Sequence, residues 1–235
     1  MIKAIATTLF ILGSFSSIAQ ESSFVHVNTL SPESGIHGSG FMYPDFVSGK
    51  VIFKDGATGE AGLNYSYLLS NIYFISPKGD TLVLANSETI AAVTIKSDTF
   101  WFHQNAFVKK LSHNAQAPNL FVKQSLKYTG YEKKGPYGTY SSTSAANSSA
   151  NFSADDQITT FLAKDENIIY KMEKEYFISD GYNNLHPAKK PNFFKAFPQW
   201  EQQLKNYLKE HKIDFRKADD LGKILSYIAG MNSSL

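Results

Sequence analysis

The chain has 235 residues, of which 43% are hydrophobic and 14% aromatic, a composition typical of a folded protein with a substantial core. Its 23 basic and 21 acidic residues nearly balance, and Arg216 is the only arginine. Because nucleic-acid and phosphate sites depend on clustered positive charge and on guanidinium groups, the composition argues against both ligand classes. The absence of cysteine excludes disulfide bonds, thiolate metal sites, a thiol nucleophile and a lipid-bearing N-terminal cysteine.

Residues 1–19 have the pattern of a secretory signal peptide. Lys3 supplies a basic start, residues 5–12 are apolar, and Ser17-Ile18-Ala19 places small residues where a signal peptidase cleaves. The apolar stretch is shorter than the roughly 20 residues that a bilayer-spanning helix needs, which disfavours the alternative of a retained anchor. We therefore expect export, cleavage before Gln20, no transmembrane segment afterwards, and no lipoprotein. The expected location is the periplasm, the periplasmic face of the outer membrane, or the outside of the cell.

The region that follows the leader is expected to lack regular structure. Within residues 20–47, the stretch 31–40 consists almost entirely of glycine, serine and other turn-forming residues. We therefore expect an irregular N-terminal arm over 20–47.

Residues 48–178 contain short apolar or alternating segments of strand length, separated by glycine, asparagine and aspartate. Asp55-Gly56 and Lys78-Gly79-Asp80 stand between such segments, where hairpin turns are needed. Because these connections leave no room for a crossover helix, the strands must pair antiparallel. The predicted strands are 49–54, 60–68, 71–76, 81–85, 90–96, 98–103, 106–111, 119–128, 157–163 and 169–178.

Within this antiparallel β-domain, one stretch differs from the rest. Residues 137–154 are rich in serine, alanine and asparagine and contain almost no large apolar side chain. Such a segment cannot bury enough surface to offset the loss of chain entropy. We expect a mobile loop over 137–154.

Toward the C-terminus the spacing of the apolar residues changes to about 3.6, which predicts helices. Pro198 can begin the first helix, Asp214 can cap the second, and Gly230 can end it. We expect a linker over 179–197 and a helical hairpin over 198–230, with its apolar stripes packed on each other, on the sheet or on a partner. The stripes are Trp200, Leu204, Tyr207, Leu208 and His211 in the first helix, and Leu221, Ile224, Leu225 and Ile228 in the second.

Together these elements predict an α+β fold, an antiparallel β-sandwich or roll followed by a C-terminal helical hairpin. The stretches 49–56 and 63–67 resemble a family of uncharacterised exported cell-envelope proteins from Bacteroidota-type Gram-negative bacteria, and residues 208–227 are similar to its helical tail. The likeness covers about 40–128 and 157–230 as an order of strands and helices. It implies an envelope location and this architecture, and it implies no mechanism because that family has no assigned activity.

The sequence contains no recognisable catalytic pattern. Ser39 lies between two glycines beside His37, but a nucleophile elbow needs Gly-x-Ser-x-Gly on a strand-to-helix turn. The acids in the pairs Asp155-Asp156 and Asp219-Asp220 are adjacent, so their side chains diverge instead of facing each other across a cleft. We expect the second pair to stabilise the start of a helix. We therefore expect a protein that is not an enzyme, with an active site built from scattered residues as the alternative.

The six histidines offer no metal-binding spacing on a single element, since none are two or four residues apart. His103 and His113 could meet across a hairpin, although two polar residues on a sheet face is the simpler interpretation. His211 is expected to cap the end of a helix. We therefore expect neither a metal nor a cofactor.

Tyrosines and lysines gather where the serine-rich loop begins. Such a group can stack on the sugars of a glycan or bind a protein, whereas the alternative is that the tyrosines are half-buried strand residues. We expect a non-catalytic protein that binds or assembles with an envelope protein, with a ligand-binding module for a glycan or a small apolar molecule as the alternative. The candidate contact residues are Tyr128, Tyr131, Lys133, Lys134, Tyr137 and Tyr140, together with Leu221, Ile224 and Ile228 on the second helix.

Overall fold

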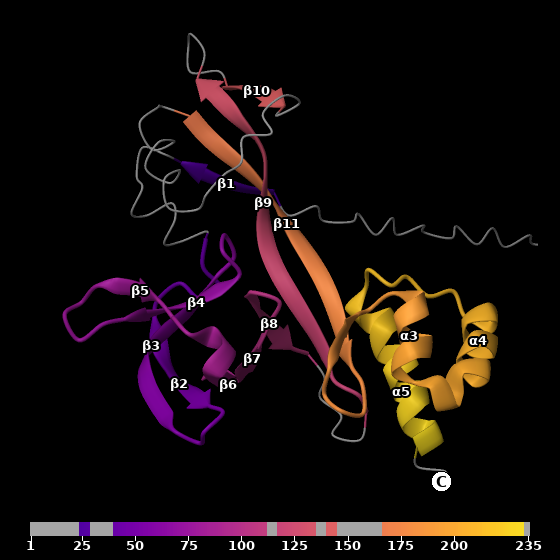
Figure 1. Cartoon of the computed structure of the whole chain (residues 1–235). Helices are drawn as coiled ribbons and strands as arrows, with labels where there is room; N and C mark the ends of the chain where they lie inside the picture. Colours follow the sequence, from indigo (N-terminus) through magenta and orange to yellow (C-terminus); the bar gives the residue numbers. More distant parts are fainter. Residues whose placement is uncertain (1–23, 29–39, 112–116, 135–139, 145–165, 233–235) are drawn as a thin grey trace, which may run out of the picture.

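The computed structural model describes residues 24–28, 40–111, 117–134, 140–144 and 166–232. In these residues a 12-stranded sheet is followed by a helical region, so the chain is α+β as expected (Figure 1). The strands are β1 (Phe24–Asn28), β2 (Val47–Phe53), β3 (Thr58–Ser66), β4 (Asn71–Ile75), β5 (Thr81–Val83), β6 (Ile90–Ile95), β7 (Asp98–His103), β8 (Ala106–Lys110), β9 (Leu120–Lys134), β10 (Tyr140–Ser144), β11 (Glu166–Ser179) and β12 (Leu185–Pro187). The helices are the 3-10 turns η1 (Ser87–Thr89) and η3 (Pro198–Trp200), and α3 (Lys190–Ala196), α4 (Glu201–Glu210) and α5 (Ala218–Asn232).

The strands belong to one sheet, in the order β1-β11-β9-β8-β7-β6-β2-β3-β4-β5, with β10 beside β9 and β12 beside β11. Neighbouring strands pair antiparallel, which confirms the pairing inferred from the short connections. Each strand predicted between residues 49 and 128 overlaps an observed strand, and the strand predicted at 169–178 lies within β11. The strand predicted at 157–163 lies outside the described residues.

Both predicted hairpin turns are present. Gly56, between β2 and β3, has a φ of 90°, and Gly79, between β4 and β5, has a φ of 91°. Glycine reaches this region of backbone space at little steric cost, whereas other residues rarely adopt it. The two turns therefore set the register of the strands that they join.

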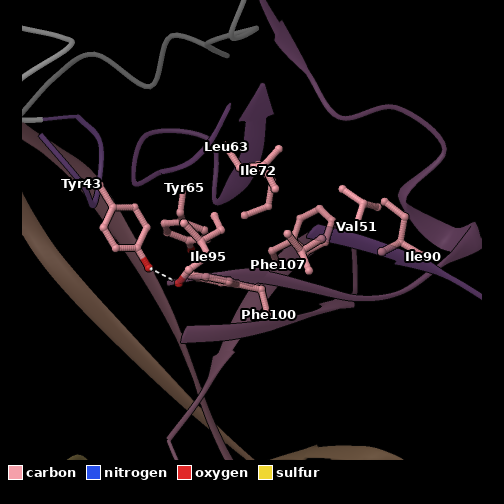
Figure 2. Packing of buried hydrophobic residues seen from close by; sticks show 10 residues of the cluster. Tyr43, Val51, Leu63, Tyr65, Ile72, Ile90, Ile95, Phe100 and Phe107 are labelled. Atoms are coloured by element: carbon pink, nitrogen blue, oxygen red, sulfur yellow. Dashed lines mark hydrogen bonds between the residues drawn. The ribbon is translucent and has the colours of Figure 1, made fainter. Parts of the chain in front are cut away.

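The strands β2, β3, β4, β6, β7 and β8 curl around a shared apolar core (Figure 2). The curl is held where the N–H of Phe107 in β8 donates to the carbonyl of Ser70, in the turn after β3, at 2.8 Å. Inside, the ring of Tyr65 stacks on that of Phe100 with 5.3 Å between centroids. The buried residues of this core are Tyr43, Val51, Leu63, Tyr65, Ile72, Ile90, Val93, Ile95, Phe100 and Phe107.

A buried amide fastens the segment before β2 to the core. Asn64 is 1% exposed, and its Oδ1 accepts the N–H of Tyr43 at 3.1 Å and that of Tyr65 at 2.9 Å. The Tyr43 hydroxyl in turn donates to the Asp98 carboxylate at 2.6 Å and reaches the carbonyl of Ile95 at 3.4 Å (Figure 2). Burial, followed by the hydrogen bond to Asp98 and its charge, raises the pKa of the Tyr43 hydroxyl, so this group stays a donor.

The two longest strands, β9 and β11, pair along nearly their whole length and form what we call the β9–β11 ribbon (Figure 1). The Tyr65 hydroxyl donates to the carbonyl of Gln124 in β9 at 2.8 Å. The N–H of Leu126 donates to the carbonyl of Tyr67, just after β3, at 2.9 Å. These bonds fasten the curled strands against the ribbon.

The helices pack against one end of the ribbon, around Leu120 and Ile178 (Figure 1). The stripe predicted for the second helix is confirmed, because each of its four members is 3% exposed or less. Isolated amphipathic helices of this length are only marginally stable, and they gain their stability from such packing. The buried residues of this helical cluster are Leu120, Ile178, Ala188, Phe193, Phe197, Leu204, Leu221, Ile224, Leu225 and Ile228.

Two strands lie where irregular chain was expected. The strand β1 falls in the predicted arm 20–47, and β10 falls in the predicted loop 137–154, so both predictions are wrong for these residues. Both strands join the ribbon by backbone pairing. Such pairing depends more on the free backbone groups of a neighbouring strand than on an apolar pattern in the strand itself. For β1 that neighbour, β11, is distant in sequence, whereas β10 pairs with the strand that directly precedes it, β9. The remainder of the predicted loop lies outside the described residues.

The C-terminal region contains more structure than predicted. The segment 179–197, expected as a linker, contains β12 and α3, and its Phe193 is 0% exposed. Helix α5 continues through the exposed Gly230 to Asn232, whereas the sequence pattern predicted an end at this glycine. An exposed glycine in a last helical turn costs only about 1 kcal/mol, which neighbouring buried residues offset.

Asp214 does not cap α5, which begins four residues later. Its carboxylate instead accepts the N–H of Arg216 and its guanidinium, each at 3.0 Å. The N–H of Asp214 donates to the carboxylate of Asp220 in the first helical turn at 3.0 Å. The negative charge at the helix start, predicted for Asp219 and Asp220, is confirmed.

Leu221→Asp places a carboxylate where the native side chain is fully buried in the helical cluster. We expect the free energy of unfolding to fall by at least about 3 kcal/mol, because a buried, unpaired charge is costly. Urea denaturation followed by circular dichroism measures the change. The matched control is Ser226→Asp, which adds the same charge on the exposed face of α5 and should change stability by less than about 0.5 kcal/mol. Equal stability of the two variants would contradict the packing.

Tyr65→Phe removes the hydroxyl that joins the curled strands to the ribbon at Gln124. We expect a loss of about 1–2 kcal/mol, since the carbonyl keeps its place but loses its donor. Tyr182→Phe is the control, because Tyr182 is 90% exposed. Thermal melts of both variants against the wild type provide the comparison, and an unchanged melt for Tyr65→Phe would show that the bond contributes nothing.

Candidate functional site

The predicted tyrosine and lysine group falls on β9 and β10. The backbone register brings Tyr131, Lys133, Lys134 and Tyr140 into one stretch of the sheet, with Lys134 opposite Tyr140. Tyr137 lies outside the described residues, as do the side chains of the other four. The register supports the grouping of these positions, and their contact with a ligand or partner stays a prediction.

Tyr128, the first residue of that group, has a described side chain. Its ring meets the ring of Tyr170 edge to face, with 6.2 Å between centroids. The ribbon is irregular here, and the Thr129 hydroxyl donates to the carbonyl of Ile169 at 3.0 Å. Burial, followed by the neighbouring Tyr128, raises the pKa of Tyr170. This environment agrees with the alternative interpretation, a half-buried strand tyrosine.

The three helical candidates are not surface residues. Leu221, Ile224 and Ile228 are each 0% exposed, because they form the centre of the helical cluster. A partner could reach them only if the helices came apart. Their prediction as partner contacts is therefore corrected, since the chain itself covers the stripe.

The strand β5 presents an edge that the sequence analysis did not single out. Among the described residues it is the last strand in the sheet order and is bonded to β4 alone, and the β4–β5 hairpin projects away from the helices (Figure 1). Leu82 is 45% exposed and Val83 is 39% exposed. Together with Tyr182, they are the large hydrophobic side chains that stand exposed in the described part of the chain. Sheet edges are normally blunted by a very short edge strand, by lysine or proline, or by a covering element. The strand Thr81–Val83 is short, with three residues, and carries neither lysine nor proline.

The hydrogen-bond pattern shows which backbone groups of β5 face outward. The Asp80 carbonyl and the Leu84 N–H each bond across to the β4 side at 2.8 Å. Because such backbone groups alternate in direction along an antiparallel strand, the N–H and C=O of Leu82 also point toward β4. The N–H and C=O of Thr81 and Val83 point away from the sheet. We call these outward groups, with the exposed Leu82 and Val83 side chains, the β5 edge.

A second exposed feature is the turn between β11 and β12. Tyr182 is 90% exposed at its tip, and Asn183 has a φ of 63°. The Asp180 carboxylate accepts the N–H groups of Tyr182 at 2.8 Å and Asn184 at 2.9 Å, and lies 3.0 Å from Nε2 of His186. Although burial alone raises the pKa of Asp180, the hydrogen bonds from His186, Asn184 and Tyr182 outweigh it and hold the pKa well below its usual value. The turn thus holds an exposed aromatic residue, a residue type enriched at binding interfaces.

Near this turn lies a histidine with an unsatisfied ring nitrogen. His103 packs edge to face on Phe177 with 5.2 Å between centroids, and its Nε2 is buried without a hydrogen-bond partner among the described residues. Burial, followed by the charge of His186, lowers the pKa of His103, so its ring is neutral near pH 7. His113, which was considered as its neighbour, lies outside the described residues.

The capping role predicted for His211 is confirmed. It directly follows α4, and its Nδ1 lies 3.0 Å from the carbonyl of Tyr207 in the last turn, on which its ring also stacks. In the part of the chain that the structure describes, no three histidine, aspartate or glutamate residues are placed to hold a metal ion. The described residues also include no helix long and apolar enough to cross a membrane. Ser39 with His37, and Asp155-Asp156, lie outside this part.

No protein-family model, no curated protein and no solved structure matches the chain. The candidate site therefore has to be judged on its own geometry, in which the β5 edge combines free backbone groups with exposed apolar side chains. The sequence pattern did predict a strand at 81–85. Its position at the end of the sheet follows from the order in which distant strands pair, which no local pattern contains.

Asp180→Asn tests how firmly the turn is held. Because the folded state lowers the pKa of Asp180, its carboxylate stabilises the fold above the unfolded-state value near pH 4, and this contribution is lost as the pH falls through the lower folded-state pKa. We expect the variant to be about 1–3 kcal/mol less stable than the wild type at pH 7, with the difference narrowing toward pH 3. Urea titrations of both proteins at pH 7 and pH 3 measure this difference in stability. Asp45→Asn, at an exposed carboxyl, is the control for the loss of one negative charge.

Proposed function

We propose that this chain is a non-catalytic exported protein of the cell envelope that binds another protein by strand addition at the β5 edge. The observation that carries the proposal is that edge itself. Thr81 and Val83 turn backbone donors and acceptors outward, while Leu82 and Val83 are exposed beside them. An extended strand from a partner would satisfy the backbone groups and cover the apolar side chains at the same time.

The packing of the curled strands supports this proposal over a ligand held inside the β-domain. The interior is occupied by contacting side chains, among them the stacked rings of Tyr65 and Phe100 (Figure 2). We further propose that β2 to β8 act as an antiparallel roll and that α4 and α5 act as a helical hairpin that closes one end of the ribbon. In this arrangement the apolar faces of the two helices pack within the chain, which favours the β5 edge over the helices as the surface for a partner.

The envelope location in this proposal rests on the sequence. Residues 1–19 have the basic start, apolar stretch and small-residue cleavage site of a secretory signal peptide. We place the mature chain, beginning at Gln20, in the periplasm, at the periplasmic face of the outer membrane, or outside the cell. Its partner is then expected to be an envelope protein that offers an extended, mainly apolar segment.

Capture of partners from gently solubilised native envelopes tests the function. We expect tagged mature chain to retain an envelope protein at a stoichiometric level, as read by mass spectrometry, and Leu82→Lys to reduce that recovery at least about tenfold, since a lysine is the residue that blocks strand edges. Ala85→Lys is the matched control, because it adds the same charge at an exposed position just beyond β5. Equal recovery with wild type, Leu82→Lys and Ala85→Lys would refute binding at the β5 edge.

A further inference from the structure

We propose that the strand added at the β5 edge is β5 of a second copy of this chain, paired antiparallel about a two-fold axis at Leu82. The inference rests on the proposed function, because it names the occupant of the same edge. It follows from the arrangement of the outward backbone groups, from the exposed side chains between them, and from the absence of charge over residues 81–85.

The outward groups of β5 are arranged symmetrically around one residue. The backbone N–H and C=O groups of Thr81 and Val83 point away from β4, whereas those of Leu82, between them, point toward β4. In an antiparallel pair centred on Leu82, Thr81 of one copy lies opposite Val83 of the other. Each such pair exchanges an N–H···O bond in both directions, as hydrogen-bonded positions of an antiparallel ladder do. The strand is therefore complementary to itself, which is what a two-fold interface requires.

The exposed side chains fit the same arrangement. Leu82 would lie opposite Leu82 of the other copy in a non-hydrogen-bonded pair, where the two Cα atoms are about 4.5 Å apart and the side chains are closest. Leu82 is 45% exposed in the single chain, so this contact covers the more exposed apolar side chain of the strand. Val83 would pack beside the methyl group of Thr81. Aliphatic cross-strand pairs of this kind stabilise sheets.

The segment that would pair carries no charge. Residues 81–85 are uncharged, so no like charges would face each other between two copies of the strand. Outside this segment, Lys78 and Asp80 are exposed before β5, and Glu88 is exposed in η1 after it, so the flanking charges do not select the arrangement.

The size of the shared strand sets the expected strength. Pairing of Thr81–Val83 covers far less than the roughly 1,200 Å² of surface that a stable complex buries. We therefore expect a loose dimer that forms and dissociates with concentration, and that becomes dominant where the chain is concentrated.

Disulfide trapping offers a sharp test because the chain has no cysteine of its own. Leu82→Cys in the mature chain places one thiol on the proposed axis, at a Cα separation within the range that a disulfide spans. Under mild oxidation with oxidised glutathione, we expect a covalent dimer on non-reducing gels. Thr81→Cys is the matched control. Thr81 would lie opposite Val83 of the other copy, so the two introduced cysteines would stand two residues apart along the strand and too far from each other to form a disulfide. We expect at least about five times more cross-linking with Leu82→Cys than with Thr81→Cys.

Sedimentation velocity over about 1 µM to 1 mM provides a reading without a cross-link. The wild type and Ala85→Lys should dimerise with rising concentration, while Leu82→Lys and Val83→Pro should stay monomeric. Val83→Pro removes an N–H that faces away from β4, so its thermal melt should match that of the wild type.

Equal cross-linking of the two cysteine variants, or a wild type that stays monomeric, would overturn the second copy as the occupant. If envelope capture still depended on Leu82 in that case, the proposed function would stand with a different partner. If capture were also indifferent to Leu82→Lys, both proposals would fail.

Discussion

The antiparallel pairing of β9 with β11 is the interaction on which the other parts of the structure depend. The curled strands join it through the Tyr65 hydroxyl and the Leu126 N–H, and the helical cluster packs around Leu120 at its start and Ile178 near its end. The curled strands have a core of their own, whereas the helical cluster includes Leu120 and Ile178 of the ribbon. A third, small cluster of Val108, Phe121 and Phe177 joins β8 to the ribbon. Because β9 and β11 are separated in sequence by more than thirty residues, the helical cluster is complete only after these two strands have met.

A sheet organised around a central ribbon has open ends. Among the described residues, β5 lies at one end, bonded to β4 alone, with the outward groups of Thr81 and Val83 on its free side. At the other end of the strand order, β1 is bonded to β11 alone. Proteins usually protect such edges, and an uncharged edge with exposed Leu82 is therefore informative about function. The proposed pairing with a second copy would convert this open end into a continuous sheet.

Much of the fold could be predicted because its causes are local. Gly56 and Gly79 mark turns that require a positive φ, and the apolar spacing of Leu221, Ile224 and Ile228 marks a helix with one buried face. The strands β1 and β10 could not be predicted in the same way. Both strands are held by backbone pairing with the ribbon: β1 pairs with β11, far away in sequence, and β10 pairs with β9, although the polar residues of β10 carry no apolar strand pattern.

The sequence by itself therefore determined the strands between residues 47 and 128, two of their turns, the last two helices and the apolar side of the last helix, since alternation, glycine positions and 3.6-residue spacing act within a few residues. Only the tertiary structure decided what those surfaces meet. It buried Leu221, Ile224 and Ile228 against the chain's own core and left Leu82 at an unpaired edge. The physical reason is that burial depends on the order in which distant strands pair, and an apolar side chain has the same local pattern whether its own chain or a partner covers it.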